Sequence, residues 1–386
     1  MVASSKLAAK TSAAKAKVTD SHTKPKVRAV KPITHGSDFA GLGTFSIAIK
    51  KLAKLCPNSF VPHHLFSCDN FAPSEAFIRF TDNPVKFHKD ILKRIDAELP
   101  DSLDLYSWTG PCQGLSQAGK RKGIADPRTQ LLFKSLDFIQ KVKPKAFVME
   151  NVPQLATHSK HKPLWQIILS HLTECNYSVE HKVVNTSQYL PQNRERLYLV
   201  GIRRDVKRGY DRGVPLFPHP PPKRILELSD IVQELPINRW MAYPKNLNQQ
   251  NNVVAAYKAL PQGTNPFLVP VVIDAKASAR FSTHRVNESP ALTKTRANQF
   301  GYWISTKGGW MTLGEMAAMQ GYFGDDFPVE AAGISKSTAA SMLGNSQSLP
   351  LVQDLVAHTM YHACLVTYQQ FIVMKAKMYA AWGLPK

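Results

Sequence analysis

The sequence predicts an α/β protein with a doubly wound, mostly parallel sheet and a smaller, irregular domain. Three observations support this fold class. Short apolar segments alternate with helical ones over residues 32–203, as in strands joined by crossover helices. The first apolar segment ends in a glycine turn that opens a helix. Residues 204–284 then lose this regularity, and helical segments resume within residues 285–386.

The first strand is expected over residues 33–39, and the turn after it contains Gly41 and Gly43. Helical periodicity follows over residues 47–55. Glycine lets the backbone approach a ligand closely, and the N–H groups at a helix start point towards that ligand. A lone Gly-x-Gly is a weak signal, but strand, glycine turn and helix together favour a nucleotide-binding turn.

The second predicted strand, over residues 64–69, ends in Asp69. Doubly wound folds commonly place a carboxylate at the end of this strand, where it binds a ribose. Asp69 is therefore the candidate ribose ligand.

A third predicted strand, over residues 103–108, breaks at Gly110-Pro111, so Cys112 follows at its carboxyl end. A single cysteine is more often a small buried hydrophobe. Here the next residues form a polar, basic loop that includes the run 120–122, and nearby cations lower the pKa of a thiol. The thiolate is the nucleophilic form, so Cys112 is a candidate nucleophile.

Later segments continue the alternation of helix and strand. A helix over 131–141 precedes an apolar strand that ends in Glu150, and a later strand begins with Arg194 and Arg196. Alternate residues of a strand point to the same face, so the two arginines should share one face. Glu150 could equally be a satisfied loop acid, and the arginines could face solvent. A helix over 352–366 closes the pattern.

Composition excludes several classes of protein. The 386 residues are 44% hydrophobic, enough for one large domain and a smaller one. Five cysteines without a C-x-x-C pair argue against a zinc site and a disulfide framework. The polar loop with His158 and His161 is interpreted as a solvated turn, so no metal is expected. No apolar run is long enough to span a membrane.

The net charge of +21 points to a polyanionic partner such as nucleic acid, with a basic protein that binds no nucleic acid as the alternative. Residues 1–31 carry eight Lys and Arg and one Asp among Ala, Ser and Thr, which predicts a disordered basic tail. Such a tail could enter nuclei or contact phosphates. An organellar transit peptide and a plain solvated tail are the alternatives.

Three short motifs in order carry a family resemblance. The segments Gly110-Pro111-Cys112-Gln113, Glu150-Asn151-Val152 and Gln192-Asn193-Arg194-Glu195-Arg196 resemble the catalytic motifs of the cytosine-5 DNA methyltransferases that use S-adenosylmethionine. The glycine turn, Lys89-Asp90-Ile91 and Gly344-Asn345-Ser346 resemble other motifs of that family. The resemblance covers about 33–204 and 285–366. Cys68-Asp69-Asn70 departs from the family, which usually has Glu at the end of the second strand.

The resemblance implies a Rossmann-like class I methyltransferase fold and methyl transfer to C5 of a flipped-out cytosine in double-stranded DNA, through a covalent Cys112 adduct at C6. Glu150 would hold the N3/N4 edge of the base, while Arg194 and Arg196 would neutralise charge and position the base or Glu150. The implied ligands of S-adenosylmethionine are Phe39, Ala40, Gly41, Gly43, Asp69, Asp90, Ile91, Pro111, Leu131, Asn345 and Ser346. The implied substrate-binding residues are Gln113, Ser116, Asn151 and Gln192.

In this family, the position of residues 204–284 holds the target-recognition domain, and residues 285–386 complete the catalytic domain begun at 32–203. Arg239, Trp240 and Tyr243 are candidate base contacts, with plain packing as the alternative.

Two other functions stay open. A tRNA cytosine-5 methyltransferase uses the same catalytic motifs, whereas a non-catalytic, DNA-binding regulatory homologue usually loses the catalytic residues that are present here. DNA is favoured over tRNA because the Cys-Phe-Thr-x-x-Tyr stretch of the tRNA-modifying branch is absent from the sequence. We expect a monomer in the nucleus, with an organelle, or the cytoplasm or nucleoid of a prokaryotic or viral system, as alternatives.

Overall fold

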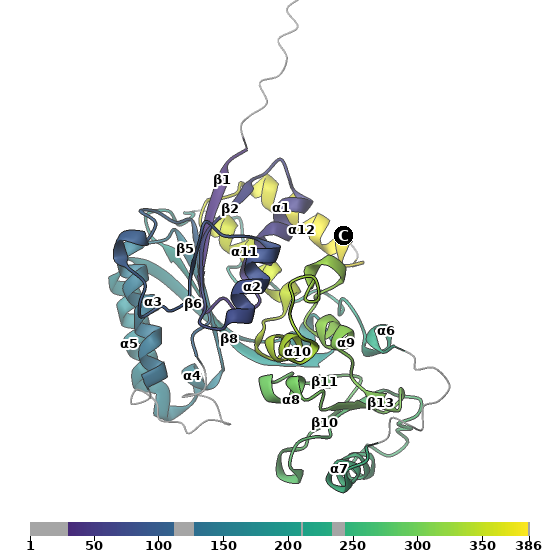
Figure 1. Ribbon diagram of the computed structural model, residues 1–386. Helices are drawn as coiled ribbons and strands as arrows, with labels where there is room; N and C mark the ends of the chain where they lie inside the picture. The colour runs from purple at the N-terminus through teal and green to yellow at the C-terminus, as the bar shows by residue number, and fades with distance from the viewer. Residues whose placement is uncertain (1–29, 112–126, 210, 234–243, 385–386) are drawn as a thin grey trace, which may run out of the picture.

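The computed structural model describes residues 30–111, 127–209, 211–233 and 244–384. Within these ranges a seven-stranded sheet forms the centre of the larger lobe (Figure 1), in the order β3-β2-β1-β4-β5-β8-β6. Its strands are β1 (Pro32–Asp38), β2 (Val61–Cys68), β3 (Lys86–His88), β4 (Leu105–Trp108), β5 (Ala146–Asn151), β6 (Tyr177–Asn185) and β8 (Glu195–Arg203).

The sheet is mostly parallel. β8 runs antiparallel to β5 and β6, whereas β1, β2, β3, β4 and β5 pair in parallel. Strand order reverses at β1, which pairs with β2 on one side and β4 on the other. The predicted doubly wound α/β fold is therefore confirmed.

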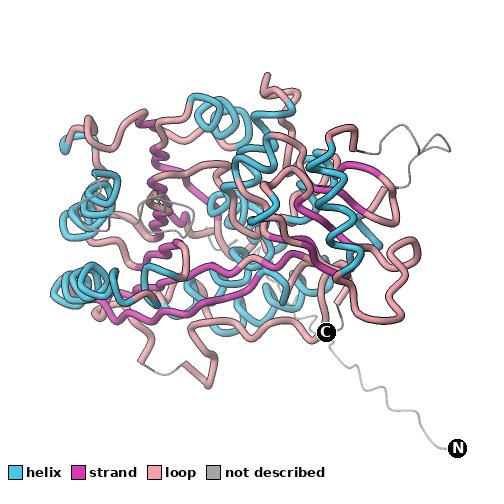
Figure 2. Tube along the Cα trace, turned by 90° about the horizontal axis from the view of Figure 1, so that it is seen from below, coloured by secondary structure: helices cyan, strands magenta, loops and turns pink. Residues whose placement is uncertain are grey.

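Helices cover both faces of the sheet, as Figures 1 and 2 show from two directions. One hydrophobic core contains Leu105 and Val148, and the other contains their neighbours Tyr106 and Phe147. Because successive strand residues point to opposite faces, the two cores lie on opposite sides of the sheet. The first core packs against α1 (Thr44–Leu55), α11 (Leu349–His362) and α12 (Tyr368–Ala381), and the second against α3 (Pro127–Val142) and α5 (Lys162–Glu174).

A smaller antiparallel sheet, in the order β10-β9-β12-β13, lies in the other lobe. Val253, Ile273 and Trp303 form its core. The elements of this lobe are α7 (Leu247–Lys258), β9 (Val271–Asp274), β10 (His284–Val286), β12 (Tyr302–Ile304) and β13 (Gly309–Trp310). The sequence predicts that the target-recognition domain ends at residue 284. The smaller sheet, however, contains β9 before that residue and β12 and β13 after it, so the predicted domain boundary does not coincide with the edge of this sheet.

The segment after β8 packs largely against the larger lobe. Phe217, Leu228 and Ile231 belong to the same core as α1 and α11, and Leu228 and Ile231 lie on α6 (Leu228–Ile231). The two lobes meet where β7 (Gln192–Asn193) pairs with β11 (Ser289–Pro290). Between the lobes lie α8 (Lys294–Asn298), α9 (Leu313–Met319) and α10 (Lys336–Asn345), while α2 (Ala72–Thr81) follows β2 and α4 (Gln154–Thr157) follows β5.

None of the helices in the described ranges is long and apolar enough to cross a membrane.

Candidate active site

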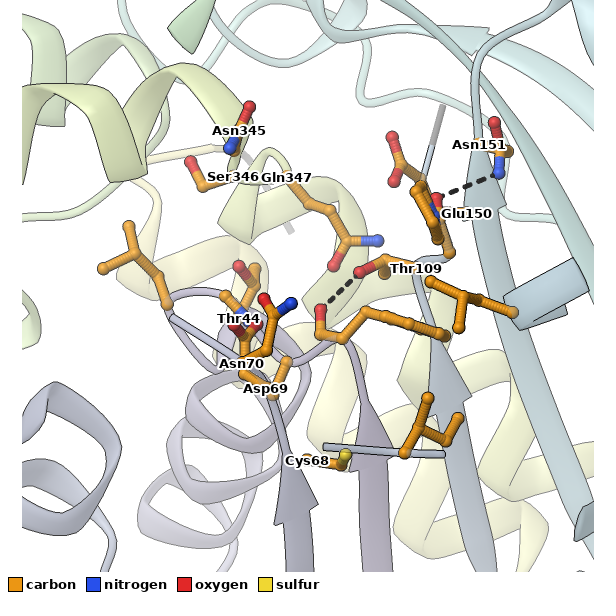
Figure 3. Close-up of a pocket in the computed structure, with 18 of the residues that line it drawn as sticks. Thr44, Cys68, Asp69, Asn70, Thr109, Glu150, Asn151, Asn345, Ser346 and Gln347 are labelled. Carbon is orange, nitrogen blue, oxygen red and sulfur yellow. Dashed lines mark hydrogen bonds between the residues drawn. The ribbon is translucent and has the colours of Figure 1, made fainter. Parts of the chain in front are cut away.

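A cavity of about 550 Å³ lies at the carboxyl ends of β1, β2, β4 and β5. Open α/β sheets bind their ligands in this crevice, where strand order reverses. In Figure 3, side chains from these strand ends and from the segment after α10 face a common space. The lining residues are Phe39, Ala40, Gly41, Leu42, Thr44, Cys68, Asp69, Asn70, Asp90, Ile91, Leu92, Thr109, Gly110, Pro111, Leu131, Glu150, Asn151, Val152, Arg194, Arg196, Gly344, Asn345, Ser346 and Gln347.

The turn between β1 and α1 forms one wall of the cavity. Phe39, Gly41 and Gly43 have positive φ angles of 57°, 56° and 67°, so the backbone bends sharply before Gly43 caps α1. The Ala40 N–H donates to the Cys68 carbonyl at 3.0 Å, which fixes the turn against the end of β2. A Cβ atom on Gly41 would meet no atom within 4 Å, so the cavity is open at this residue.

Asp69 supports this turn from the end of β2. Its Oδ2 accepts the Gly41 N–H at 2.8 Å, and its Oδ1 accepts the Phe71 N–H at 2.9 Å. Burial raises the pKa of the Asp69 carboxyl, against the effect of these two bonds. Each oxygen keeps a lone pair that could accept a ligand hydroxyl.

Asp90, Ile91 and Leu92 form the neighbouring wall. The Leu92 N–H donates to Asp90 Oδ1 at 2.9 Å, so the carboxylate closes its own turn. The other oxygen has no partner among the hydrogen bonds of this turn.

Glu150 and Arg196 face each other at the opposite end of the cavity. Glu150 is the penultimate residue of β5, and its Oε1 lies 3.1 Å from Arg196 Nε, on the paired strand β8. Burial raises the pKa of Glu150, while Arg196 and Arg194 act in the opposite direction. A buried carboxyl with a raised pKa can be protonated and donate a hydrogen bond.

Arg194 also lines the cavity, but its guanidinium is committed to backbone carbonyls. Its Nη1 donates to Leu292 O at 2.5 Å, and its Nη2 donates to Ser346 O at 2.8 Å and Gly344 O at 3.2 Å. The residue is 2% exposed, and burial lowers the pKa of its guanidinium to about 9. Arg194 therefore fastens the segment after α10 to the entrance of α8.

Two predicted substrate ligands hold backbone segments in place. Asn151 Nδ2 donates to Gly110 O at 3.2 Å, which joins the ends of β5 and β4 (Figure 3). Gln192 lies outside the cavity lining, where its amide donates to Met319 O at 2.7 Å and accepts from the Leu292 N–H at 3.0 Å. Contact of either side chain with a substrate stays a prediction.

Most predicted site residues in the described ranges come together in this cavity. Of the predicted cofactor ligands, only Gly43 is absent from the lining, and this residue caps α1. The lining also contains residues that were not predicted as ligands, and each lies within two positions of a predicted one. They are Leu42, Thr44, Cys68, Asn70, Leu92, Thr109, Gly110, Val152, Gly344 and Gln347. Cys112, Gln113, Ser116, Arg239, Trp240, Tyr243 and residues 1–29 lie outside the described residues.

A separate polar cluster lies between β1, β2 and α2. Donor atoms of His35, His64 and Asp82 approach within 4.8 Å of one another. However, the two imidazole rings stack at 4.4 Å with planes only 18° apart, so their in-plane lone pairs do not converge on one point. Lys50 Nζ, 3.1 Å from Asp82 Oδ1, already supplies a cation. We interpret the cluster as a hydrogen-bonded part of the core, in which Ser46 Oγ lies 2.8 Å from His35 Nε2.

Comparison with known proteins places this geometry in a wider context. The model of a family described as C-5 cytosine-specific DNA methylase matches residues 36–360. The chain is 28% identical over 331 residues to the type II methyltransferase M.HpaII of Haemophilus parainfluenzae, covering 82% of this chain and 86% of that one. It is 34% identical over 173 residues to the orphan methyltransferase M.Rho11sI of Bacillus phage rho11s, covering 44% and 32% of the two chains.

Solved structures share the fold. The Entamoeba histolytica methyltransferase EhMeth aligns with a TM-score of 0.58 at 15% identity, over 86% of this chain and 98% of that one. The Dnmt2 methyltransferase of S. pombe aligns with a TM-score of 0.56 at 15% identity, over 85% and 98%. M.HpaII and M.Rho11sI come from a bacterium and a phage, so the expected nuclear location finds no support.

Proposed function

The chain belongs to the C-5 cytosine-specific DNA methylase family, and we propose that it methylates a cytosine rotated out of duplex DNA, through a covalent bond between Cys112 and C6 of the base. The protein is a DNA cytosine-5 methyltransferase, and its family uses S-adenosylmethionine as the methyl donor. The bacterial and phage sources of its relatives favour the cytoplasm or nucleoid as its location.

The residues of the cavity fit this donor. S-adenosylmethionine supplies an electrophilic methyl group on a sulfonium. The amino end of α1 favours a carboxylate, because its first N–H groups lack helical partners. Asp69 offers acceptors to ribose hydroxyls, and Asp90 offers one to an amino group. The open space at Gly41 leaves room for a ligand against the backbone.

Cys112 is proposed to activate the base. Carbon 5 of cytosine is too weak a nucleophile to attack a sulfonium methyl unaided. Addition of the Cys112 thiolate to C6 breaks the C5–C6 double bond and moves its electron pair towards C5. C5 then takes the methyl group, which leaves S-adenosylhomocysteine. A water molecule accepts the C5 proton, and the electron pair of the C5–H bond restores the C5–C6 double bond and expels the thiolate. Pro111, the residue before Cys112 in the chain, lines the cavity.

Glu150 and Arg196 are proposed to hold the cytosine during this addition. A protonated Glu150 can donate to N3 and so offset the negative charge that builds on the ring when C6 is attacked. Arg196, 3.1 Å from Glu150, fixes the direction of that carboxyl. Arg194 contributes through the backbone segments that it fastens.

The observation that carries the proposal is that one cavity contains both the glycine turn and the Glu150–Arg196 pair. A donor bound at the turn and a base held by Glu150 would therefore meet in the same space.

The direct test is transfer of labelled methyl groups from S-adenosylmethionine to duplex DNA and to tRNA by the purified full chain. We expect label in DNA as 5-methylcytosine, and none with Cys112→Ala. Transfer by Cys112→Ala at the wild-type rate, or transfer to tRNA alone, would contradict the proposal. Bisulfite sequencing of DNA from an expressing host then identifies the target sites.

A further inference from the structure

Arg94 joins two walls of the cavity without lining it. It follows the wall formed by residues 90–92, and Asp38 directly precedes Phe39 of the glycine turn. Arg94 Nη1 lies 2.5 Å from Asp38 Oδ1, and Nη2 lies 3.1 Å from Asp38 Oδ2. Both side chains are buried, with 6% of Arg94 and none of Asp38 exposed. The planar guanidinium therefore holds the two walls in one relative orientation.

Elements that lead to the catalytic motif meet at the same ion pair. The Tyr106 hydroxyl, on β4, donates to Asp38 Oδ2 at 2.6 Å. The Arg94 guanidinium lies 4.9 Å from the ring centroid of Phe138 on α3, and 5.5 Å from that of Phe66 on β2. β4 runs towards Pro111, and α3 carries Leu131, another lining residue.

We propose that Arg94 is a positioning residue for the methyl donor, which presets the distance between the glycine turn and residues 90–92. This inference rests on the proposed function, because that function supplies the identity of the ligand. A buried ion pair contributes little net stability compared with apolar residues of the same volume. Its value here lies in preorganisation: the ligand need not spend binding free energy on bringing the walls together.

The test compares two double variants that each replace a buried ion pair with neutral side chains. Asp38→Asn with Arg94→Met removes the pair at the cavity. The matched control, Glu315→Gln with Lys307→Met, removes a pair that is equally buried, with Lys307 Nζ 2.8 Å from Glu315 Oε2, between the small sheet and α9. Neither Lys307 nor Glu315 lines the cavity. Removing both partners avoids leaving an unpaired buried charge that could prevent folding.

Binding of S-adenosylhomocysteine is measured by calorimetry on the full chain, together with KM and kcat for methyl transfer. We expect the cavity variant to bind about tenfold more weakly than wild type, with a similar rise in KM for the donor and a kcat within about twofold. The control should bind like wild type, even if both variants unfold at lower temperature.

Arg94→Lys provides a second measurement, because it keeps the charge but cannot bind both carboxylate oxygens with a planar fork. An intermediate loss of affinity supports positioning. Equal affinity of the cavity variant and the control, or a fall in kcat at unchanged KM, overturns the inference. If wild type itself fails to bind S-adenosylhomocysteine, the proposed function fails and this inference with it. Weaker binding by the cavity variant alone supports the inference whether or not DNA is methylated.

Discussion

The two arginines of the Gln-x-Arg-x-Arg motif should have different roles, which Arg194→Met and Arg196→Met separate. Methionine keeps much of the side-chain length and removes every donor. Arg194 bonds to three backbone carbonyls in a buried position, whereas Arg196 pairs with Glu150 and keeps 20% of its side chain exposed. We therefore expect Arg194→Met to act mainly on folding and donor binding, and Arg196→Met mainly on turnover.

The magnitude follows from these hydrogen bonds. Arg194→Met removes three bonds from a charged donor, at about 1.5 to 3 kcal/mol each, and leaves the buried carbonyls unpaired. Relief of the unfavourable burial of the charge offsets part of this loss, so we expect a decrease of about 3 kcal/mol in the free energy of unfolding. For a chain of this size that lowers Tm by about 5 °C. Arg196→Met removes the partly exposed pair with Glu150 and should lower the free energy of unfolding by about 1 kcal/mol.

Chemical denaturation gives the stabilities, and methylation rates at saturating donor and DNA give kcat. We expect Arg196→Met to lose at least about a hundredfold in kcat, since a general acid typically contributes that much and Glu150 loses its orientation. Arg194→Met should keep a larger share of kcat, with a raised KM for the donor, because Asn345 and Ser346 shift. Equal stability of the two variants, or a larger loss of kcat for Arg194→Met, would refute the division.

Three further predictions follow from the site and the charge. Burial raises the pKa of Glu150 above its ordinary value of 4.5, so ionisation of this carboxyl opposes folding as pH rises past that value. Glu150→Gln should therefore be inactive yet more stable than wild type at pH 8, and the difference in the free energy of unfolding should vanish near pH 4. A constant difference across this pH range would contradict the assignment. Gly344→Ala should lower the free energy of unfolding by about 1–3 kcal/mol and weaken donor binding, because the added Cβ would lie 2.5 Å from the Thr293 backbone. Unchanged unfolding and donor-titration curves would show that the backbone there can move aside. Deletion of residues 1–29 should make the plot of the logarithm of the DNA-binding constant against the logarithm of salt concentration less steep, by roughly 0.9 for each phosphate that these residues neutralise. An unchanged slope would mean that they do not bind DNA.

The strands that form the cavity could be predicted from the sequence because each ends in a distinctive residue. Asp69, Gly110 and Glu150 terminate apolar segments, and the structure places all three at one edge of the sheet. Motif spacing fixes such positions because parallel strands bring their carboxyl ends together. The neighbours of these residues line the same cavity for the same reason.

Long-range pairings could not be predicted in this way. Arg194 and Arg196 look equivalent in the sequence, but the carbonyls that bind Arg194 lie 98, 150 and 152 residues further along the chain. Likewise, nothing near Arg94 indicates that its partner is Asp38, 56 residues earlier. Pairings of this kind depend on the tertiary fold.

Helix α12 is not among the predicted elements, although the sequence carries a local signal for it. Helix α12 begins with a capping box in which Thr367 and Gln370 bond to each other's backbone, and its buried residues Phe371, Met374 and Met378 follow helical spacing. A Thr-x-x-Gln start before such a pattern predicts a helix. The sequence carries no comparable signal for the strands of the smaller sheet on either side of the domain boundary predicted at residue 284. Strands as short as β10 and β12 contain too few residues to show a periodic pattern.

The central claim is that Cys112 bonds covalently to C6 of the target cytosine. The most direct measurement incubates the full chain and S-adenosylmethionine with duplex DNA that carries 5-fluorocytosine at the target site, and maps the trapped complex by peptide mass spectrometry. Fluorine at C5 cannot leave as a proton does, so the thioether should persist, and we predict a DNA adduct on the peptide that contains Cys112. Recovery of an adduct on another residue, or equal trapping by Cys112→Ala, would contradict the claim.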